Sequence, residues 1–469
     1  MLVESSSTTT QEGTSEVNGN STRRVKVDTG GDGVVAHVGL HALGCYADVL
    51  GLGGALSAQI VPSGERLPVH DRGKVLVHAM LTLAGGGDAV ADVEFLRSQP
   101  ALFGPVPSDS TLYRTYRQID AATLARLWGA FAEVRAKVWG RVDTGEPVVL
   151  DIDASLVEIH SEHKQGTAAT YKGGYGFHPM FCFADATGEM LGALLRPGNA
   201  AANSAEDHLT VLDQAVGQLP AEIAAGHHDG DDPASVARRV MVRADSAGAT
   251  RGFVAGCRAR NIGFAVVARK NTNIHKAISH VRFDESCWQA ATRPNGEART
   301  DAKVCEITDL VDLSRWPSGT RLIVRREPLH PGAQQSLFPS LSFRYWGHYT
   351  DQAGDPVTLD QQMRAHAHVE DHIGRLKDAG LERFPFVDLD ANRARLAIVA
   401  FAADLVRWFQ LDCLDGPLAT AEPKTLRWQL WHAPARFIRR ARQHIVRILD
   451  NWPTADVLLR AYKRIALIT

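Results

Sequence analysis

The spacing of apolar residues divides the chain into helical and strand-forming stretches. In the first third, apolar positions recur every three or four residues, the period of an amphipathic helix, in three stretches: 37–60, 71–83 and 121–142. Ser108 offers an N-cap for a further short helix that carries Arg114 and Arg117. We therefore predict an N-terminal helical domain over residues 31–145 that binds DNA in the manner of a helix-turn-helix; a purely structural helical domain is the alternative.

The pattern changes at Glu146, where short β-branched and apolar runs begin. They predict buried strands at 147–157, 180–185, 189–196, 239–245 and 263–269, with amphipathic helices at 205–219 and 250–260. Strands alternating with helices in this way predict a mixed α/β domain over residues 146–270.

Long helical periods are absent from the next stretch and then return. Short strand candidates at 303–309, 321–326 and 342–350, separated by Pro and Gly turns, predict a β-rich insertion over residues 271–357. Helical spacing resumes at 358–379, 391–413 and 425–450. We expect residues 358–415 to complete the α/β domain and residues 416–469 to form basic C-terminal helices.

Composition excludes several classes of protein. Hydrophobic residues make up 45% of the chain, but no apolar run is long enough to span a membrane. Residues 1–30 lack the apolar core of a signal peptide and are rich in Ser, Thr and Gly, so we expect a disordered leader and a cytoplasmic protein. The six cysteines are scattered singly, which argues against both a zinc ribbon and a disulfide framework.

Charge is balanced overall but concentrated at the C-terminus. The formal net charge is −2, yet residues 423–469 carry ten Lys or Arg against two Asp, a local net charge of +8. Such a segment is suited to a polyanion, and Arg439, Arg440 and Arg442 are its candidate DNA-binding residues.

Acidic residues interrupt the predicted strands. Asp151 and Asp153 lie two positions apart and so share one face of a strand, and Asp245 closes another strand. Carboxylates that converge at a sheet edge repel one another unless a hard divalent cation neutralises them, which favours Mg²⁺, with Mn²⁺ as a possible substitute. Glu370, on a predicted helix, is the candidate third ligand. Taken singly, each of these acids has a structural alternative as a cap, turn or solvated residue.

Bases accompany Glu370 on its predicted helix. Lys377 lies seven positions on, two turns along the same face, where it is placed to hold a DNA phosphate, and Arg364 is a second candidate. His368 and His372 flank Glu370, but a zinc-protease helix needs Glu directly after the first His, where Val369 stands.

Five motifs in a fixed order resemble one protein family. They are Leu150-Asp-Ile-Asp-Ala-Ser, Tyr171-Lys-Gly-Gly-Tyr-Gly-Phe-His-Pro, Leu195-Arg-Pro-Gly-Asn, Val242-Arg-Ala-Asp-Ser and His368-Val-Glu-Asp-His-Ile. The sequence resembles the DDE transposases of bacterial insertion sequences, specifically the thirteen-eighty family, from about Val75 to Arg464.

The resemblance implies an RNase H-like catalytic core interrupted by the β-rich insertion. It assigns Asp153, Asp245 and Glu370 to the family's catalytic and metal-binding triad, and prefers Asp153 to Asp151 because Ala-Ser follows it. It further implies a nucleoid-associated enzyme that binds terminal inverted repeats of double-stranded DNA, pairs the two ends as a homodimer, and cuts and joins them to target DNA.

One departure from the family leaves alternatives open. Related transposases carry Tyr and Arg where this chain has Met363 and His366, although Glu370 and Lys377 are kept. Arg364 or His368 is then left to supply the phosphate contact, and hairpin formation stays an open question. A domesticated, inactive DNA-binding protein is the first alternative function, and an RNase H-like nuclease without strand transfer is the second.

Overall fold

The computed structural model describes residues 15–17, 25–27, 30–61, 68–224, 239–329, 343–441 and 443–468. Most of the predicted leader lies outside these residues. Within it, strands β1 (Ser15–Val17) and β2 (Val25–Val27) form an antiparallel pair, which the prediction of a wholly disordered leader did not include. No helix among the described residues is long and apolar enough to cross a membrane.

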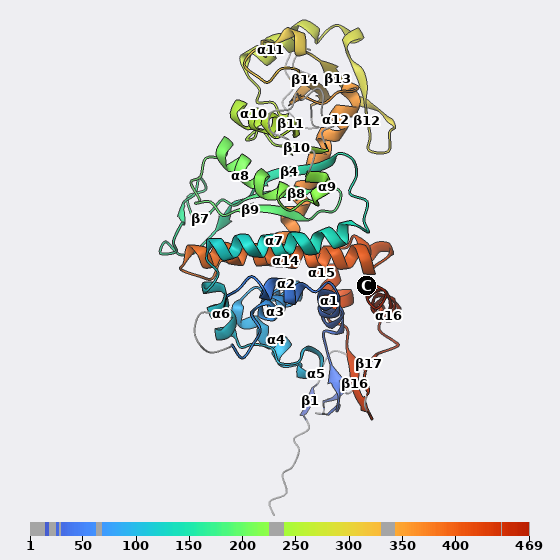
Figure 1. The fold of residues 1–469 in the computed structure, drawn as a ribbon. Coiled ribbons are helices and arrows are strands. Elements are labelled where there is room, and N and C mark those ends of the chain that lie inside the picture. Colours follow the sequence, from blue (N-terminus) through green and yellow to red (C-terminus); the bar gives the residue numbers. More distant parts are fainter. Residues whose placement is uncertain are drawn as a thin grey trace, which may run out of the picture.

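The predicted N-terminal helices are present, together with short turns between them. They are α1 (Val38–Val49), α2 (Leu52–Ser57), α3 (Arg72–Ala84), α4 (Glu94–Arg97), α5 (Pro100–Phe103), α6 (Asp109–Arg117) and α7 (Ala121–Trp139). As expected, the Ser108 side chain caps α6 by accepting a hydrogen bond from the Thr111 amide. These helices share one hydrophobic core with the long helix α14 (Leu389–Cys413), which runs beside α7 through the middle of the molecule (Figure 1).

A nine-stranded mixed sheet forms the second half of the molecule. Its order is β12-β13-β14-β15-β11-β10-β4-β8-β9. The central strands are β4 (Val148–Ala154), β10 (Val240–Ala244) and β11 (Gly263–Val267), which are mutually parallel, and β8 (Met180–Ala184) and β9 (Met190–Leu194), which continue from β4 as antiparallel neighbours. The predicted α/β pattern of this region is confirmed.

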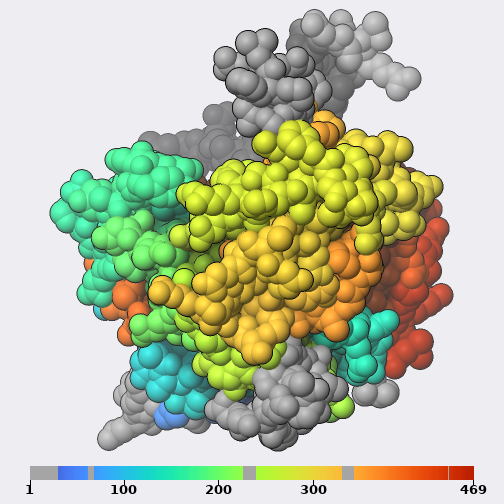
Figure 2. Space-filling model, turned by 90° about the horizontal axis from the view of Figure 1, so that it is seen from above, coloured from blue at the N-terminus to red at the C-terminus, as the bar shows by residue number. Residues whose placement is uncertain are grey.

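The predicted β-rich insertion is also present, but it extends the same sheet. Strand β15 (Phe343–Thr350) pairs antiparallel with β11 and carries β14 (Arg321–Pro328), β13 (Ala298–Glu306) and β12 (Gln289–Thr292) beyond it. A helix that the sequence pattern did not indicate, α11 (Thr272–Val281), begins the insertion. Viewed from above, the yellow and orange residues of the insertion cover much of this end of the molecule (Figure 2).

Helices cover the two faces of the sheet differently. Even-numbered residues of β4 and β10, such as Leu150 and Val242, pack in a core with α8 (Ala205–Val216) and α10 (Arg251–Ala259). The opposite face meets α12 (Pro356–Arg364), a short 3-10 turn (Ala365–Ala367) and α13 (His368–Leu376), which form one nearly continuous helical segment before a π turn (Lys377–Leu381). The odd-numbered residues of β4 therefore face this segment.

Smaller elements complete the α/β region. A three-stranded sheet contains β5 (Val157–Glu158), β6 (Ala168–Ala169) and β7 (Tyr175–Phe177), and α9 (Ala221–Ala224) follows α8. The glycine motif forms a tight turn between β6 and β7, where Gly173 adopts a positive φ and the Thr170 amide donates to the Gly174 carbonyl.

The predicted helix over residues 425–450 is wrong. A short helix α15 (Pro423–Leu426) and a π turn (Arg427–Trp431) end before Pro434, and an antiparallel pair of strands, β16 (Ala435–Arg440) and β17 (Gln443–Ile448), takes the place of the helix. Strand β3 (Val34–Val35) pairs with β16, and helix α16 (Ala455–Ile465) follows. Proline cannot continue a helix, and the partner strand from the other end of the chain stabilises the extended form.

A buried charged cluster joins α7, the sheet and α14. Arg135 donates to Glu189 (2.8 Å) and to Asp404 (2.7 Å), and all three side chains are essentially inaccessible to solvent. Two tryptophan indoles, Trp139 and Trp408, donate to the Glu189 carboxylate. Because these buried polar groups are hydrogen-bonded to one another, the cluster fixes the position of α7 and α14 relative to the sheet.

Candidate active site

The ends of β4 and β10 bring two of the predicted aspartates together. In the parallel register, Arg243 lies opposite Asp151 and Ala244 opposite Ile152, so the following pair along both strands is Asp245 and Asp153. The Ala154 amide donates to Asp153 at 2.7 Å, and the Ala247 amide donates to Asp245 at 2.8 Å. Both carboxylates are partly exposed at the same edge of the sheet.

Asp151 is neutralised within the protein. Arg243 forms a two-bond pair with it, through Nε to Oδ1 (2.8 Å) and Nη2 to Oδ2 (2.5 Å), and His366 Nδ1 lies 2.7 Å from Oδ1. Burial by itself would raise the pKa of Asp151, but the hydrogen bonds from His366 and Arg243 outweigh it and lower the pKa. Asp151 is thus a buried ion-pair partner, which distinguishes it from Asp153.

The helical segment above the sheet places Glu370 near Asp153. Gln362, His366 and Glu370 are spaced four residues apart and so lie on one stripe of the segment. The Gln362 carbonyl accepts from Arg243 (2.7 Å), and His366 contacts Asp151. Four helical residues advance about 6 Å and two strand residues about 6.6 Å. The step from His366 to Glu370 therefore matches the step from Asp151 to Asp153.

The electrostatics of Asp153 reflect these neighbours. The pKa of the Asp153 carboxyl is raised to about 6, chiefly by burial and also by the negative charges of Asp245 and Glu370, against the opposing hydrogen bond from Ala154. The negative charges of Asp245 and Glu370 thus act on the Asp153 carboxyl. A carboxylate in such surroundings is stabilised in its charged form by a nearby cation.

The carboxylates of Asp153, Asp245 and Glu370 are chemically suited to a hard divalent ion, although the structure does not bring all three together around one point. In the described part of the chain, no three His, Cys, Asp or Glu side chains lie close enough together to hold a metal ion. Asp153, Asp245 and Glu370 offer only carboxylate oxygens, the ligands that Mg²⁺ and Mn²⁺ prefer. Glu370 is exposed on its helix, whereas the two aspartates are held by backbone amides.

The predicted phosphate-binding residues have different surroundings. Arg364 pairs with Asp360 at 3.0 Å and also donates to the Thr292 carbonyl, so its guanidinium is already engaged within the protein. His368 pairs with Asp185 at 3.0 Å, an aspartate that also contacts Arg243. The side chain of Lys377, partly exposed at the start of the π turn, makes no hydrogen bond or ion pair with any described residue. Of these three residues, Lys377 is left available for a ligand.

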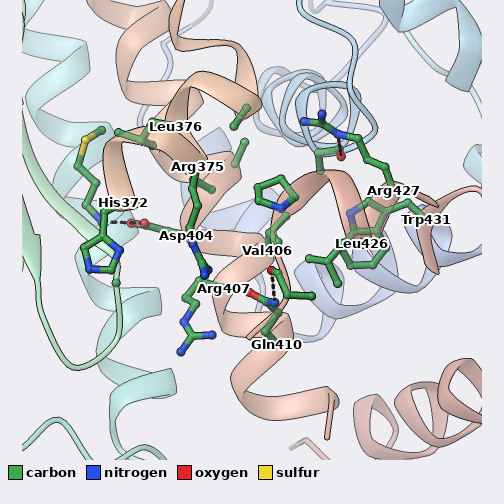
Figure 3. A pocket seen from close by; sticks show the side chains of 18 of the residues that line it. His372, Arg375, Leu376, Asp404, Val406, Arg407, Gln410, Leu426, Arg427 and Trp431 are labelled. Atoms are coloured by element: carbon green, nitrogen blue, oxygen red, sulfur yellow. Dashed lines mark hydrogen bonds between the residues drawn. The ribbon is translucent and has the colours of Figure 1, made fainter. Parts of the chain in front are cut away.

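A small cavity lies behind the helix that carries Glu370 (Figure 3). His372 and Arg375 line it from α13, and Asp404 and Arg407 line it from α14. His372 is two residues, about half a turn, from Glu370, so the two side chains leave α13 on different sides. The cavity therefore lies between α13 and α14, on a different side of α13 from Glu370.

Two of the three arginines near the C-terminus that were predicted to bind DNA lie on a strand and not on a helix. Arg439 and Arg440 are exposed near the end of β16, and Arg442 lies outside the described residues. In Figure 1, β16 and β17 project at the opposite end of the molecule from the insertion. These bases are thus remote from the carboxylates of β4 and β10.

Sequence reasoning missed the residues that neutralise Asp151. In the sequence, Arg243 stands out only as part of the motif around Asp245, and His366 only as a departure from the family pattern. The available signal was an arginine inside an otherwise apolar strand, Val240–Ala244, because a buried charge requires a partner.

The comparison with known families gives the identification. The family described as "Transposase DDE domain group 1" matches residues 17–469. The chain belongs to this family. It is therefore a DDE transposase, which confirms the broader prediction; the assignment to the thirteen-eighty family stays a prediction.

Two further comparisons were made. No curated protein matches the chain. Among solved structures, the transposase is similar to the piggyBac transposase in the cryo-EM structure of its synaptic complex with hairpin DNA. The two are 11% identical with a TM-score of 0.39, over 83% of this chain and 79% of that chain.

Proposed function

We propose that this transposase belongs to the thirteen-eighty insertion-sequence group and performs metal-dependent cleavage and strand transfer at terminal inverted repeats. The observation that carries the proposal is the matched spacing of His366 and Glu370 over Asp151 and Asp153, with Asp245 next to Asp153 in the strand register. The ion pair with Arg243 and the contact with His366 already engage Asp151, which leaves Asp153, Asp245 and Glu370 as the three acids for a metal site.

The strand order supports an RNase H-like catalytic core. Three parallel strands, β4, β10 and β11, adjoin an antiparallel pair, β8 and β9, and the first and second strands of the parallel set carry Asp153 and Asp245 at their ends. Glu370 returns on a helix after the insertion. In this proposal residues 146–270 and 358–415 form the core and residues 31–145 bind DNA. The insertion joins the core sheet through the pairing of β15 with β11.

Each residue of the site then has a distinct role. A divalent ion bound here would activate a water or a 3′-hydroxyl and stabilise the leaving oxygen of phosphoryl transfer. Asp153 and Asp245, held by backbone amides, would hold it from the sheet, and Glu370 would approach from the helix. Lys377 would hold a phosphate of the cleaved strand, since no described residue neutralises it.

The inactive alternative loses its main support. It depended on His366 in place of an arginine, and His366 makes a buried contact with Asp151 at 2.7 Å. The residue thus stabilises the strand that carries Asp153. We therefore propose an active enzyme that acts on chromosomal DNA in the cytoplasm. Two copies of the transposase would pair the two ends of the insertion sequence.

The test is a cleavage and strand-transfer assay on the DNA that flanks the gene, with Mg²⁺ or Mn²⁺. The proposal expects cuts at the repeat boundaries and joined products, both lost in Asp153→Asn and Asp245→Asn proteins. Binding without cutting would support the inactive DNA-binding protein. Cutting without joining would support a nuclease. Cutting at the wild-type rate by both variants would contradict the site assignment.

A further inference from the structure

The antiparallel strands β16 and β17 form a basic ribbon near the C-terminus, which β3 joins at its base, opposite Ala435 and Arg436, and which is two-stranded toward its tip. The register places Arg436 opposite Arg447, Ile438 opposite Ile445 and Arg440 opposite Gln443. Because side chains alternate along a strand, Arg436, Arg440 and Arg447 lie on one face of the ribbon. All three are exposed.

This face carries an unbalanced positive charge. Like charges directly opposite one another on paired strands are destabilising, yet Arg436 and Arg447 are opposite partners. Neither β16 nor β17 contains an acidic residue. Asp32 and Asp450 are the nearest acids along β3 and β17, and no ion pair joins a described residue to any of the three arginines. An external anion is the natural partner for this arrangement.

The base and the tip of the ribbon differ in packing. On the other face, Phe437, Val446 and Ile448 pack on a small core around Val35 and Leu102, which anchors the base. Toward the tip, Arg439, Arg440, Gln443 and His444 are exposed, so both faces are open to solvent there. In Figure 1 the two strands project from the helical body. The ribbon is thus a fixed but protruding element.

The dimensions of the ribbon match duplex DNA. The major groove is about 12 Å wide and admits a two-stranded β-ribbon. Four strand residues separate Arg436 from Arg440, a distance of about 13 Å at about 3.3 Å per residue. The Arg436–Arg447 pair and Arg440 are therefore spaced to reach phosphates on the two sides of such a groove.

We propose that the β16–β17 ribbon is a DNA-binding element that enters the major groove of duplex DNA and contacts its phosphates through Arg436, Arg440 and Arg447. The inference rests on the proposed function, because it takes the anion to be DNA on which this transposase acts. The ribbon is remote from β4 and β10, whose ends carry Asp153 and Asp245. It would therefore bind the duplex at the end of the element, away from the phosphate that is cleaved, and take no part in the chemical step.

The test is the salt dependence of DNA binding by the full chain. Fluorescence anisotropy would be measured with a labelled duplex of about three helical turns taken from the DNA flanking the gene, and with a random duplex of equal length. Each phosphate contact contributes about −0.9 to the slope of log K against log salt concentration. The Arg436→Ala/Arg447→Ala protein should lose about 2 from the magnitude of this slope on both duplexes.

Three controls keep the test specific. Arg260→Ala removes an arginine at the end of α10 that is paired with Asp213. It lies outside the ribbon, so this variant should keep the wild-type slope. Arg436→Lys/Arg447→Lys, which retains both charges, should restore most of the slope. Thermal melting of the alanine variant should match the wild type, because both side chains are exposed.

The outcomes separate this inference from the proposed function. A slope unchanged in the doubly substituted alanine protein would overturn the ribbon's role, even if the wild-type enzyme cuts and joins DNA. A wild-type protein that binds but never cuts would contradict the proposed function, while a slope reduced by about 2 would still support the ribbon. An equal loss of slope in the Arg260→Ala protein would also overturn the inference.

Discussion

His366 Nδ1 lies 2.7 Å from Asp151 Oδ1, and this contact fixes the helical segment relative to strand β4. Arg243 holds the same carboxylate from the neighbouring strand. One buried aspartate therefore aligns both elements that carry the other acids. We therefore propose that Asp151 positions the candidate site and that Asp153 belongs to it.

Substitution of Asp151 and of Asp153 should affect the free energy of unfolding differently. Asp151→Ala leaves the buried Arg243 with only the partial compensation of Asp185, at 3.0 Å, and should reduce the free energy of unfolding by about 3–5 kcal/mol. Asp153→Ala removes a carboxylate that is repelled by its neighbours, so its stability should be unchanged or slightly increased. Urea denaturation measures both. Equal destabilisation by the two substitutions would contradict the separation of their roles.

Divalent ions should stabilise the folded enzyme through the three carboxylates. A ligand at about 100 times its Kd stabilises by about 2.7 kcal/mol, which thermal melting detects without any DNA. We expect Mg²⁺ or Mn²⁺ to raise the Tm of the wild type, and to raise it far less in Asp245→Asn. Asp450→Asn, an exposed aspartate after β17, is the matched control and should respond as the wild type does. A full response in Asp245→Asn would place the ion elsewhere.

Lys377 should matter for DNA cleavage and not for folding. It is partly exposed and has no partner among the described residues, so Lys377→Ala should change the free energy of unfolding by less than about 0.5 kcal/mol. Loss of a phosphate contact should reduce single-turnover cleavage by at least about tenfold, equivalent to about 1.4 kcal/mol. Lys424→Ala, which removes a lysine paired with Asp378, is the comparison. Wild-type cleavage by Lys377→Ala would remove the residue from the site.

The buried cluster of Arg135, Glu189 and Asp404 should make stability depend on pH. The pKa of Asp404 is raised to about 8, chiefly by burial and also by the negative charge of Glu189, although Arg135 opposes both. The folded chain then keeps a proton that the unfolded chain releases near its ordinary pKa of 3.8. This contribution to stability is fully present below pH 3.8 and is lost as pH rises toward about 8.

The measurement is thermal melting from pH 6 to pH 9 in the wild type and in Asp404→Asn. The wild type should lose stability from pH 6 to about pH 8 and level off above that, and the substituted protein, whose amide does not titrate, should show a flatter curve below pH 8. Identical slopes in the two proteins would show that Asp404 does not carry the effect.

Much of the sheet was predictable because its strands are locally marked. The apolar runs around Leu150, Val242 and Phe264 are short and β-branched, and they form β4, β10 and β11 as expected. The helix Leu389–Cys413 was equally clear from its period. Neither pattern revealed that the insertion joins the same sheet, because the pairing of β15 with β11 is set by contacts distant in sequence.

The C-terminal ribbon and the role of Asp151 show where local patterns fail. Residues 435–448 have apolar and basic positions that also suit a helix, and pairing of β16 with Val34 and Val35 decides the structure. Pro434 was the one local signal against a continuous helix. Asp151 and Asp153 share a strand face, so the strand pattern does not distinguish them; the distinction comes from Arg243 and His366, 92 and 215 residues away, which pair with Asp151.

Iron-mediated backbone cleavage is the direct test of the proposed divalent ion site at Asp153, Asp245 and Glu370. Fe²⁺ substituted for Mg²⁺, with ascorbate and peroxide, generates radicals that cut the polypeptide next to the bound ion. We expect cuts near residues 153, 245 and 370, suppressed by excess Mg²⁺ and absent in the Asp153→Asn protein. Cuts confined to other segments, or an unchanged pattern in Asp153→Asn, would contradict it.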